Sequence, residues 1–307
     1  MELCLMIEGQ EGVSWEQWLA LAQACEAHGI GTLFRSDHYQ NLDGRDPHRA
    51  ASDAWATLSA LGAVTTTLRL GTLVSPASFR HPSVLAKMVA TADEISGGRV
   101  ELGLGAGWHE AEHAAYGFTY LPMRERLDVL EEQLQIVLGS WGSEPFDFEG
   151  AHYRLRGTDA HPKPVQRPHP PLIMGGNAGP RAAAMAARYA DEYNTVFATP
   201  AQVSERREAI ARACEQAGRE TMPFSLMTGV LIGETEAEVR TRARRLSDKA
   251  GTSDPPPGWI VGTIEDAAQQ LRELGEAGVD RVMCQQLLHD DLEAVALLGE
   301  RLAPLVA

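Results

Sequence analysis

Residues 99–117 combine residue types and spacings that support two different kinds of chemistry. They read R-V-E-L-G-L-G-A-G-W-H-E-A-E-H-A-A-Y-G, in which His109, Glu110 and His113 match the zinc-protease pattern H-E-x-x-H. The same residues hold glycines at positions 103, 105 and 107. Alternating glycines remove the side chains from one face of a strand, so that a planar cofactor or another backbone can approach it. The two interpretations predict different enzymes.

The zinc interpretation needs more than this pattern supplies. His109 and His113 would bind the metal from one helical face, with Glu110 as general base, and a third ligand would come from elsewhere. The downstream sequence shows no obvious third ligand, and Glu112 adds a charge that the pattern does not use. Such a short pattern also arises by chance in a chain with ten histidines. A zinc hydrolase is therefore the less favoured alternative.

A second candidate is Ser36-Asp37-His38, which follows the apolar segment 32–35. A histidine beside a carboxylate at a strand end can act as a general acid or base near neutral pH, or can hydrogen-bond a cofactor ring. The alternative is that His38 only caps a loop.

A third candidate is the segment P-L-I-M-G-G-N-A-G-P-R, in which an apolar strand runs through Gly175 and Gly176 into a helix. Backbone N–H groups at a helix N-terminus bind phosphate, and paired glycines let the anion approach closely. The segment is neither a Walker loop nor a G-x-G-x-x-G fingerprint, so the glycine pair alone is weak support for a phosphate site.

The elements that must position these residues alternate between strand and helix. Strands are expected at 2–7, 32–35, 68–74, 100–104, 171–174, 192–196, 224–232 and 280–284. Helices are expected at 15–28, 53–64, 82–95, 123–138, 179–189, 201–217, 236–249, 264–277 and 292–302. About eight strand–helix units predict one α/β domain over 1–307, a (β/α)8 TIM barrel, with its active site at the carboxyl ends of the strands. An open sheet with a small insert domain is the alternative.

Two segments depart from this alternation. Residues 140–171 carry six prolines and a hairpin-like F-D-F-E-G-A-H-Y-R-L, which indicates an irregular insertion. Residues 249–262 include the polar stretch T-S-D-P-P-P-G and are expected to form a mobile loop.

Composition restricts the class of protein. The 307 residues are 44% hydrophobic and 22% charged, which is typical of a globular protein, and no apolar run approaches the ~20 residues of a membrane span. The net charge of −15 argues against binding to nucleic acid or to an anionic membrane. The first residues, M-E-L-C-L-M-I-E, do not resemble a signal peptide, so we expect a cytoplasmic protein with its four cysteines reduced.

Six segments, in the same order along the chain, resemble the luciferase-like flavin and deazaflavin oxidoreductases. They are F-R-S-D-H-Y, L-R-L-G-T-L-V-S-P with F-R-H-P-S-V-L-A-K, I-S-G-G-R-V-E-L-G-L-G-A-G-W, P-K-P-V-Q-R-P-H-P-P-L-I-M-G-G-N, A-A-R-Y-A-D-E-Y-N and V-G-T-I-E-D-A-A-Q-Q-L-R-E-L-G-E-A-G-V-D-R-V. The S-D-H strand end and the G-L-G-A-G-W form most resemble the branch that uses coenzyme F420.

The resemblance implies a barrel of the bacterial-luciferase type with an insertion before strand five, where residues 140–171 fit. It places Asp37 and His38 against the cofactor ring as the acid/base pair, with Asp37 orienting His38. It places a non-proline cis peptide at Leu73–Val74, behind the ring. The remaining cofactor residues would be Gly105, Ala106, Gly107 and Trp108 along the cofactor side chain, and Gly175, Gly176 and Asn177 at the phosphate.

The resemblance therefore implies an oxidoreductase that transfers a hydride between coenzyme F420 and a small organic substrate. The alternatives are an FMN-dependent monooxygenase of the same fold and a barrel that only carries or senses a flavin. Trp108 stands where the related sugar-phosphate dehydrogenases have a catalytic glutamate, which favours a less polar substrate. Arg35, Arg80 and Arg181 are candidates to meet the acidic tail of the deazaflavin, or are solvated. A homodimer is the family expectation.

Overall fold

Eight parallel strands among the described residues close into a barrel. The computed structural model describes residues 1–42, 46, 48–250 and 255–307. The barrel strands are β1 (Glu2–Ile7), β2 (Thr32–Arg35), β3 (Arg69–Thr72), β5 (Val100–Gly105), β8 (Leu172–Gly175), β9 (Glu192–Val196), β10 (Phe224–Gly233) and β12 (Arg281–Gln285). They follow one another in that order, and β10 pairs with both β9 and β12. The TIM-barrel prediction is confirmed, and the open-sheet alternative is wrong because the β9–β10 pairing closes the ring.

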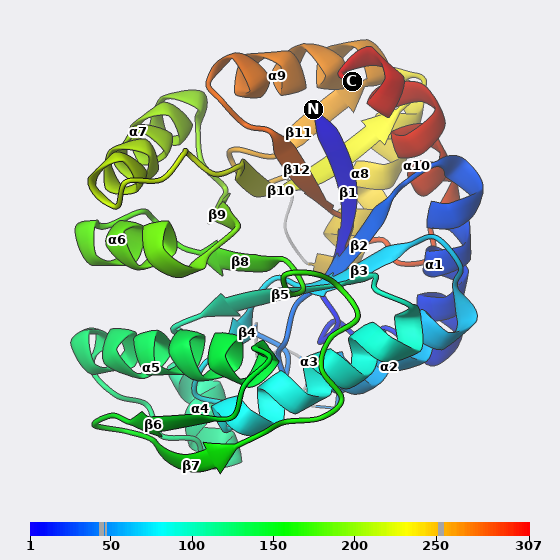
Figure 1. Ribbon diagram of the computed structural model, residues 1–307. Helices are drawn as coiled ribbons and strands as arrows, with labels where there is room; N and C mark the ends of the chain where they lie inside the picture. The colour runs from blue at the N-terminus through cyan, green and yellow to red at the C-terminus, as the bar shows by residue number, and fades with distance from the viewer. Residues whose placement is uncertain (43–45, 47, 251–254) are drawn as a thin grey trace.

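The helices pack around this barrel (Figure 1). They are α1 (Trp15–His28), α2 (Ala54–Val64), α3 (Pro82–Ser96), α4 (Glu110–Tyr116), α5 (Met123–Trp141), α6 (Pro180–Tyr189), α7 (Pro200–Gln216), α8 (Glu236–Ala250), α9 (Ile264–Glu276) and α10 (Leu292–Ala296), which Leu297–Leu302 and Ala303–Leu305 continue. Local signals set their ends: Ser14 and Gln17 form a capping box before α1, and Gly29 ends it with a left-handed φ of 80°. No helix in the described ranges is long and apolar enough to cross a membrane.

Alternation along the strands separates two cores. Leu3, Leu5 and Ile7 of β1 belong to the large apolar cluster shared with the helices. Cys4 and Met6 of the same strand belong to a smaller cluster with residues of β2, β8, β10 and β12. Because successive strand residues point to opposite faces, the second cluster fills the barrel interior.

The insertion and the predicted loop each contain strands. β6 (Phe146–Glu149) and β7 (Arg154–Thr158) pair antiparallel, so the hairpin expected within 140–171 is present, and it lies beside α5 outside the barrel (Figure 1). The loop expected at 249–262 extends too far in the prediction, because a strand begins at residue 260. Ile260 is buried and begins β11 (Ile260–Thr263), which extends the sheet on β10. Residues 251–254 of that prediction lie outside the described part of the chain.

The amino ends of the strands meet at a buried ion cluster. Arg281 at the start of β12 donates to the carboxylates of Glu101 (2.9 Å) and Glu192 (3.1 Å) and to the hydroxyl of Thr32 (3.0 Å). Four strands thus share one guanidinium inside the barrel. The predicted site residues lie at the other, carboxyl end, where TIM-barrel active sites form.

Candidate functional site

His38 is held at the barrel mouth by a buried carboxylate that lies 74 residues away in the sequence. Its Nδ1 is 2.7 Å from Oε2 of Glu112, whose side chain is fully buried in the first turn of α4. The other oxygen of Glu112 accepts the backbone N–H groups of Tyr39 (2.5 Å) and Gln40 (3.4 Å). One carboxylate therefore fixes three consecutive residues after β2, a role that the sequence alone does not indicate.

The charges around this pair favour the ionised forms of both groups. Burial alone lowers the pKa of His38, but the hydrogen bond and charge of Glu112, together with the charges of Glu8 and Asp37, raise it above the ordinary value. Burial raises the pKa of Glu112, yet the His38 bond and the Tyr39 and Gln40 donors lower it overall. An imidazole with such a partner is suited to exchange protons near neutral pH.

Asp37 does not orient His38, which corrects the prediction from the sequence. Its carboxylate accepts the Ser75 hydroxyl (2.6 Å) and two N–H groups of Arg80 (2.5 and 3.1 Å). Arg80 also bonds Asp53 (2.6 Å) and the hydroxyl of Tyr39 (2.8 Å). Asp37 thus anchors the segment after β2 to Ser75 and Arg80, while its neighbour His38 contacts Glu112.

The peptide Leu73–Val74 is cis, as the resemblance implied. The alternating glycines of β5 pack directly against it. A Cβ on Gly105 would lie 2.7 Å from Cγ2 of Val74, and one on Gly103 would lie 2.8 Å from Cγ1 and collide with the carbonyl oxygen of Thr72. The glycine face therefore first accommodates Val74, and Val74, which is only partly buried, presents an apolar surface to the mouth.

Trp108 stands over His38 at the rim of the mouth. Their rings meet edge to face at 5.9 Å, and Trp108 is 60% exposed. The backbone that carries it is held from α5 and the linker before it, because Arg126 donates to the carbonyl of Gly107 and the Tyr120 hydroxyl to that of Trp108 (2.9 Å). Gly107 itself has a positive φ of 75°. An exposed indole on a fixed backbone can cover one side of a bound ring or substrate.

The loop after β8 leads to a helix N-terminus without a side-chain cap. Gly176 and Asn177 are exposed, and the N-cap of α6, Gly179, offers no capping hydrogen bond. The Gly176 N–H bonds the carbonyl of Asn194, and the Ala178 N–H bonds the hydroxyl of Tyr193 (2.8 Å). Those two donors are in use, so a phosphate here would be bound by N–H groups of the first turn of α6.

The H-E-x-x-H pattern is used structurally. Nε2 of His113 bonds the Ser78 hydroxyl (2.6 Å), and its Nδ1 lies 2.8 Å from the carbonyl of His109. Glu110 faces solvent, whereas a zinc protease would need its carboxylate at the metal. Across the described residues, no three His, Cys, Asp or Glu side chains are arranged to hold a metal ion. The geometry thus gives the zinc interpretation no support.

The three arginines proposed for an acidic cofactor tail are already paired. Arg35 is fully buried and donates to the carbonyls of Ser36 and Ser52. Arg80 belongs to the ion pair with Asp37 described above. Arg181 pairs with two carboxylates of α5. Each of these arginines ties loops or helices together.

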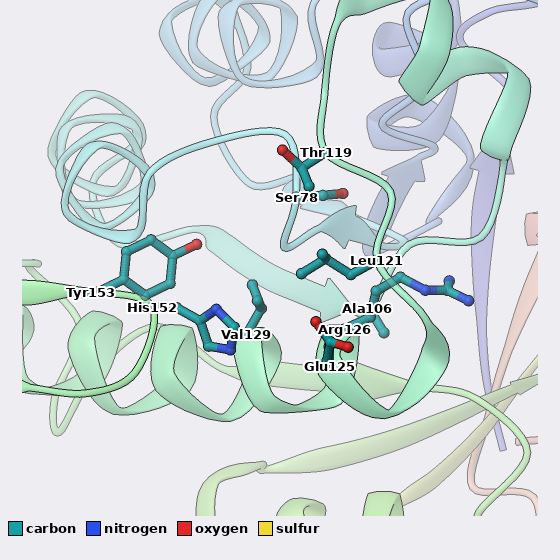
Figure 2. A pocket seen from close by; sticks show the side chains of 9 residues that line it. All are labelled: Ser78, Ala106, Thr119, Leu121, Glu125, Arg126, Val129, His152 and Tyr153. Atoms are coloured by element: carbon teal, nitrogen blue, oxygen red, sulfur yellow. The ribbon is translucent and has the colours of Figure 1, made fainter.

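A cavity of about 470 Å³ lies on the flank of the β5 end, between α5 and the insertion (Figure 2). It is lined by Ser78, Ala106, Thr119, Leu121, Glu125, Arg126, Val129, His152 and Tyr153. Among the residues predicted to bind the cofactor, Ala106 lines this cavity, and the others are not among its lining residues. The candidate site is therefore the barrel mouth.

The fold is a (β/α)8 barrel whose predicted site residues lie at the carboxyl ends of the strands. The family model for luciferase-like monooxygenases matches residues 4–300, and the chain belongs to that family. This family includes both F420-dependent and FMN-dependent enzymes.

The relatives that resemble this chain include both F420-dependent and FMNH2-dependent enzymes. The chain is 28% identical to an F420-dependent glucose-6-phosphate dehydrogenase of Nakamurella multipartita, over 92% of this chain and 90% of the relative. It is 33% identical to an FMNH2-dependent dimethylsulfone monooxygenase of Pseudomonas putida, over 81% of this chain and 72% of the relative. The crystal structure of a monooxygenase from Streptomyces bottropensis has the same fold, with a TM-score of 0.85 at 22% identity and full coverage of both chains.

Proposed function

We propose that this protein transfers a hydride between coenzyme F420 and a small organic substrate bound at the barrel mouth. The observations that carry the proposal are the His38–Glu112 pair after β2 and the uncapped N-terminus of α6 after β8, which both follow the carboxyl ends of barrel strands. The similarity to an F420-dependent relative over 92% of the chain supports the choice of cofactor.

The residues of the chain have separable tasks in this proposal. Bound coenzyme F420 supplies the two-electron chemistry by taking up or giving a hydride. His38 accepts the proton at Nε2 when a substrate hydroxyl group is oxidised, and returns it when a carbonyl group is reduced. Val74 would support one face of the bound ring, Trp108 would shield the reacting region from water, and the first turn of α6 would bind the phosphate.

Comparing two ligands tests the cofactor assignment. The apoprotein is titrated separately with FMN and with coenzyme F420, and the two dissociation constants are compared. Tighter binding of coenzyme F420 is the expected result. Tighter binding of FMN, with oxygen consumption by the reduced complex, would favour the monooxygenase alternative, which the 33% identity to an FMNH2-dependent relative supports. Failure to bind either ligand would refute the proposal.

The exposed indole of Trp108 bears on the substrate. An apolar ring beside His38 offers no charge or hydrogen-bond acceptor to a sugar hydroxyl, so we propose a substrate less polar than a sugar phosphate. Mixing the F420 complex with sugar phosphates and following the deazaflavin absorbance should show no reduction. Small secondary alcohols are the comparison series, and reduction by the sugar phosphates alone would contradict this assignment.

A further inference from the structure

Glu112, and not Asp37, is available to hydrogen-bond His38. Asp37 is buried, with its oxygens already accepting from Ser75 and Arg80. Glu112 directs one oxygen at Nδ1 of His38 and the other at the backbone that carries His38. Among the carboxylates of the described residues, Glu112 is thus the one that contacts the imidazole.

We propose that Glu112 is the positioning residue for His38, holding the proton on Nδ1 and leaving Nε2 as the nitrogen that faces the barrel mouth. The inference rests on the proposed role of His38 as the proton carrier. An ionised carboxylate can only accept a hydrogen bond, so a 2.7 Å contact requires Nδ1 to be the donor. In the neutral ring, the lone pair is then on Nε2.

The surroundings hold Glu112 itself in place. It lies in the first turn of α4, where the helix dipole favours an anion, and the N–H groups of Tyr39 and Gln40 occupy its second oxygen. The α4 helix begins at Glu110, two residues after Trp108, so one short segment carries both the residue that covers His38 and the residue that orients it. A shift of α4 would move both.

Other charged groups face the same ring. Glu8, at the end of β1, and Asp37 add negative charge near His38, while Trp108 meets its edge. His109 meets the His38 ring edge to face at 6.3 Å, and its Nδ1 is 3.9 Å from the same oxygen of Glu112, so a charge on it would compete for the carboxylate. Burial and the neighbouring His38 and His113 lower the pKa of His109, although Glu112 opposes this. Glu112 and the other nearby carboxylates thus raise the pKa of His38, whereas the pKa of His109 stays lowered.

Glu112→Gln tests the assignment, because the amide keeps the shape and reverses the polarity toward His38. Its oxygen can still accept from Tyr39 and Gln40, and its NH2 group then donates to Nδ1 of His38. The proton of the neutral ring moves to Nε2, which can no longer act as a base. Glu110→Gln is the matched control, because it makes the same charge change in the same helical turn on an exposed side chain.

The first measurement needs no cofactor. Nitrogen-15 NMR of the apoprotein, with His38 assigned by comparison with His38→Ala, should show Nδ1 protonated in the wild type and in Glu110→Gln. Glu112→Gln should shift the proton to Nε2 and lower the pH at which His38 titrates. A wild-type ring with its proton on Nε2 would overturn the proposal, and that result does not depend on whether Glu112→Gln folds.

The second measurement uses the enzyme with coenzyme F420. Glu112→Gln should lower kcat about 10²-fold, as expected when a general base is lost, with little change in the dissociation constant of the cofactor. In a His38→Ala background the same substitution should have no further effect on kcat. An equal fall in both backgrounds would show that Glu112 acts only on the fold. If the NMR result holds and no F420 turnover is found, the positioning role stands and the proposed reaction fails.

Discussion

At the residue scale, removal of the His38 side chain should lower kcat and leave the affinity for the cofactor nearly unchanged. His38→Ala leaves Val74 and the first turn of α6 in place, so affinity for the cofactor should change little. Loss of the proton carrier should lower kcat by about 10²- to 10⁴-fold. Fluorescence titration and steady-state kinetics measure the two quantities. In His38→Gln the side chain can still hydrogen-bond a ring but cannot shuttle a proton, so full activity in that variant would reduce His38 to a binding residue.

The His38–Glu112 pair should also make the free energy of unfolding depend on pH. Because the pKa of His38 is raised on folding, its share of the stability is complete below its unfolded pKa of about 6.5 and is lost as the pH rises through the folded value. Because the pKa of Glu112 is lowered, its share is complete above about 4.5 and is lost as the pH falls through the folded value. Both contributions to stability are complete only between about pH 4.5 and pH 6.5.

Urea unfolding of the wild type, Glu112→Gln and Glu110→Gln can detect that contribution. The free energy of unfolding should be lower in Glu112→Gln than in the wild type, and by a larger margin at about pH 5.5 than at about pH 9. Glu110→Gln should follow the wild type across the range, because Glu110 is exposed. A margin that grows toward pH 9 would contradict the raised pKa of His38.

At the element scale, β5 and the cis peptide form one packed unit. An alanine at position 105 would place its Cβ 2.7 Å from Cγ2 of Val74 but 4.0 Å from its Cβ. Gly105→Ala should therefore cost about 1–3 kcal/mol of stability and weaken cofactor binding, since Val74 must move. Val74→Ala removes the clash, so the double variant should be more stable than the sum of the single effects predicts. Additive losses, measured by denaturant unfolding, would show that the glycine is needed for another reason.

The sequence predicted most elements because their signals are local. Ser14 and Gly29 mark the ends of α1, and the apolar runs from Glu2 to Gln285 place all eight barrel strands. The contact between His38 and Glu112 could not be predicted, because it joins residues 74 apart and depends on the pairing of β2, β3 and β5 in the sheet. β11 was missed because its pairing with β10 likewise depends on tertiary contact. Asp37 looked like the partner of His38 only because it is adjacent in the chain.

On the scale of the whole molecule, the two ends of the barrel have different roles. Arg281 joins Glu101 and Glu192 at the amino ends, while His38, Val74 and Trp108 lie at the carboxyl ends. The arrangement agrees with the general division of TIM barrels into a stability face and a catalytic face. Burial raises the pKa of Glu192, and Arg281 opposes that rise, so the guanidinium keeps a costly pair of carboxylates in the core.

Arg281→Met should therefore lower the free energy of unfolding and leave the candidate site at the barrel mouth unchanged. Removing the guanidinium leaves two buried carboxylates facing each other, which should lower the free energy of unfolding by about 3–5 kcal/mol. Cofactor affinity and the protonation of Nδ1 in His38 should stay at wild-type values in the fraction that remains folded. Adding Glu101→Gln and Glu192→Gln removes the stranded charges, so the triple variant should recover part of the lost stability in urea unfolding. If Arg281→Met instead shifted the His38 titration while stability held, the two ends would be coupled, and the barrel mouth could not be treated as an independent site.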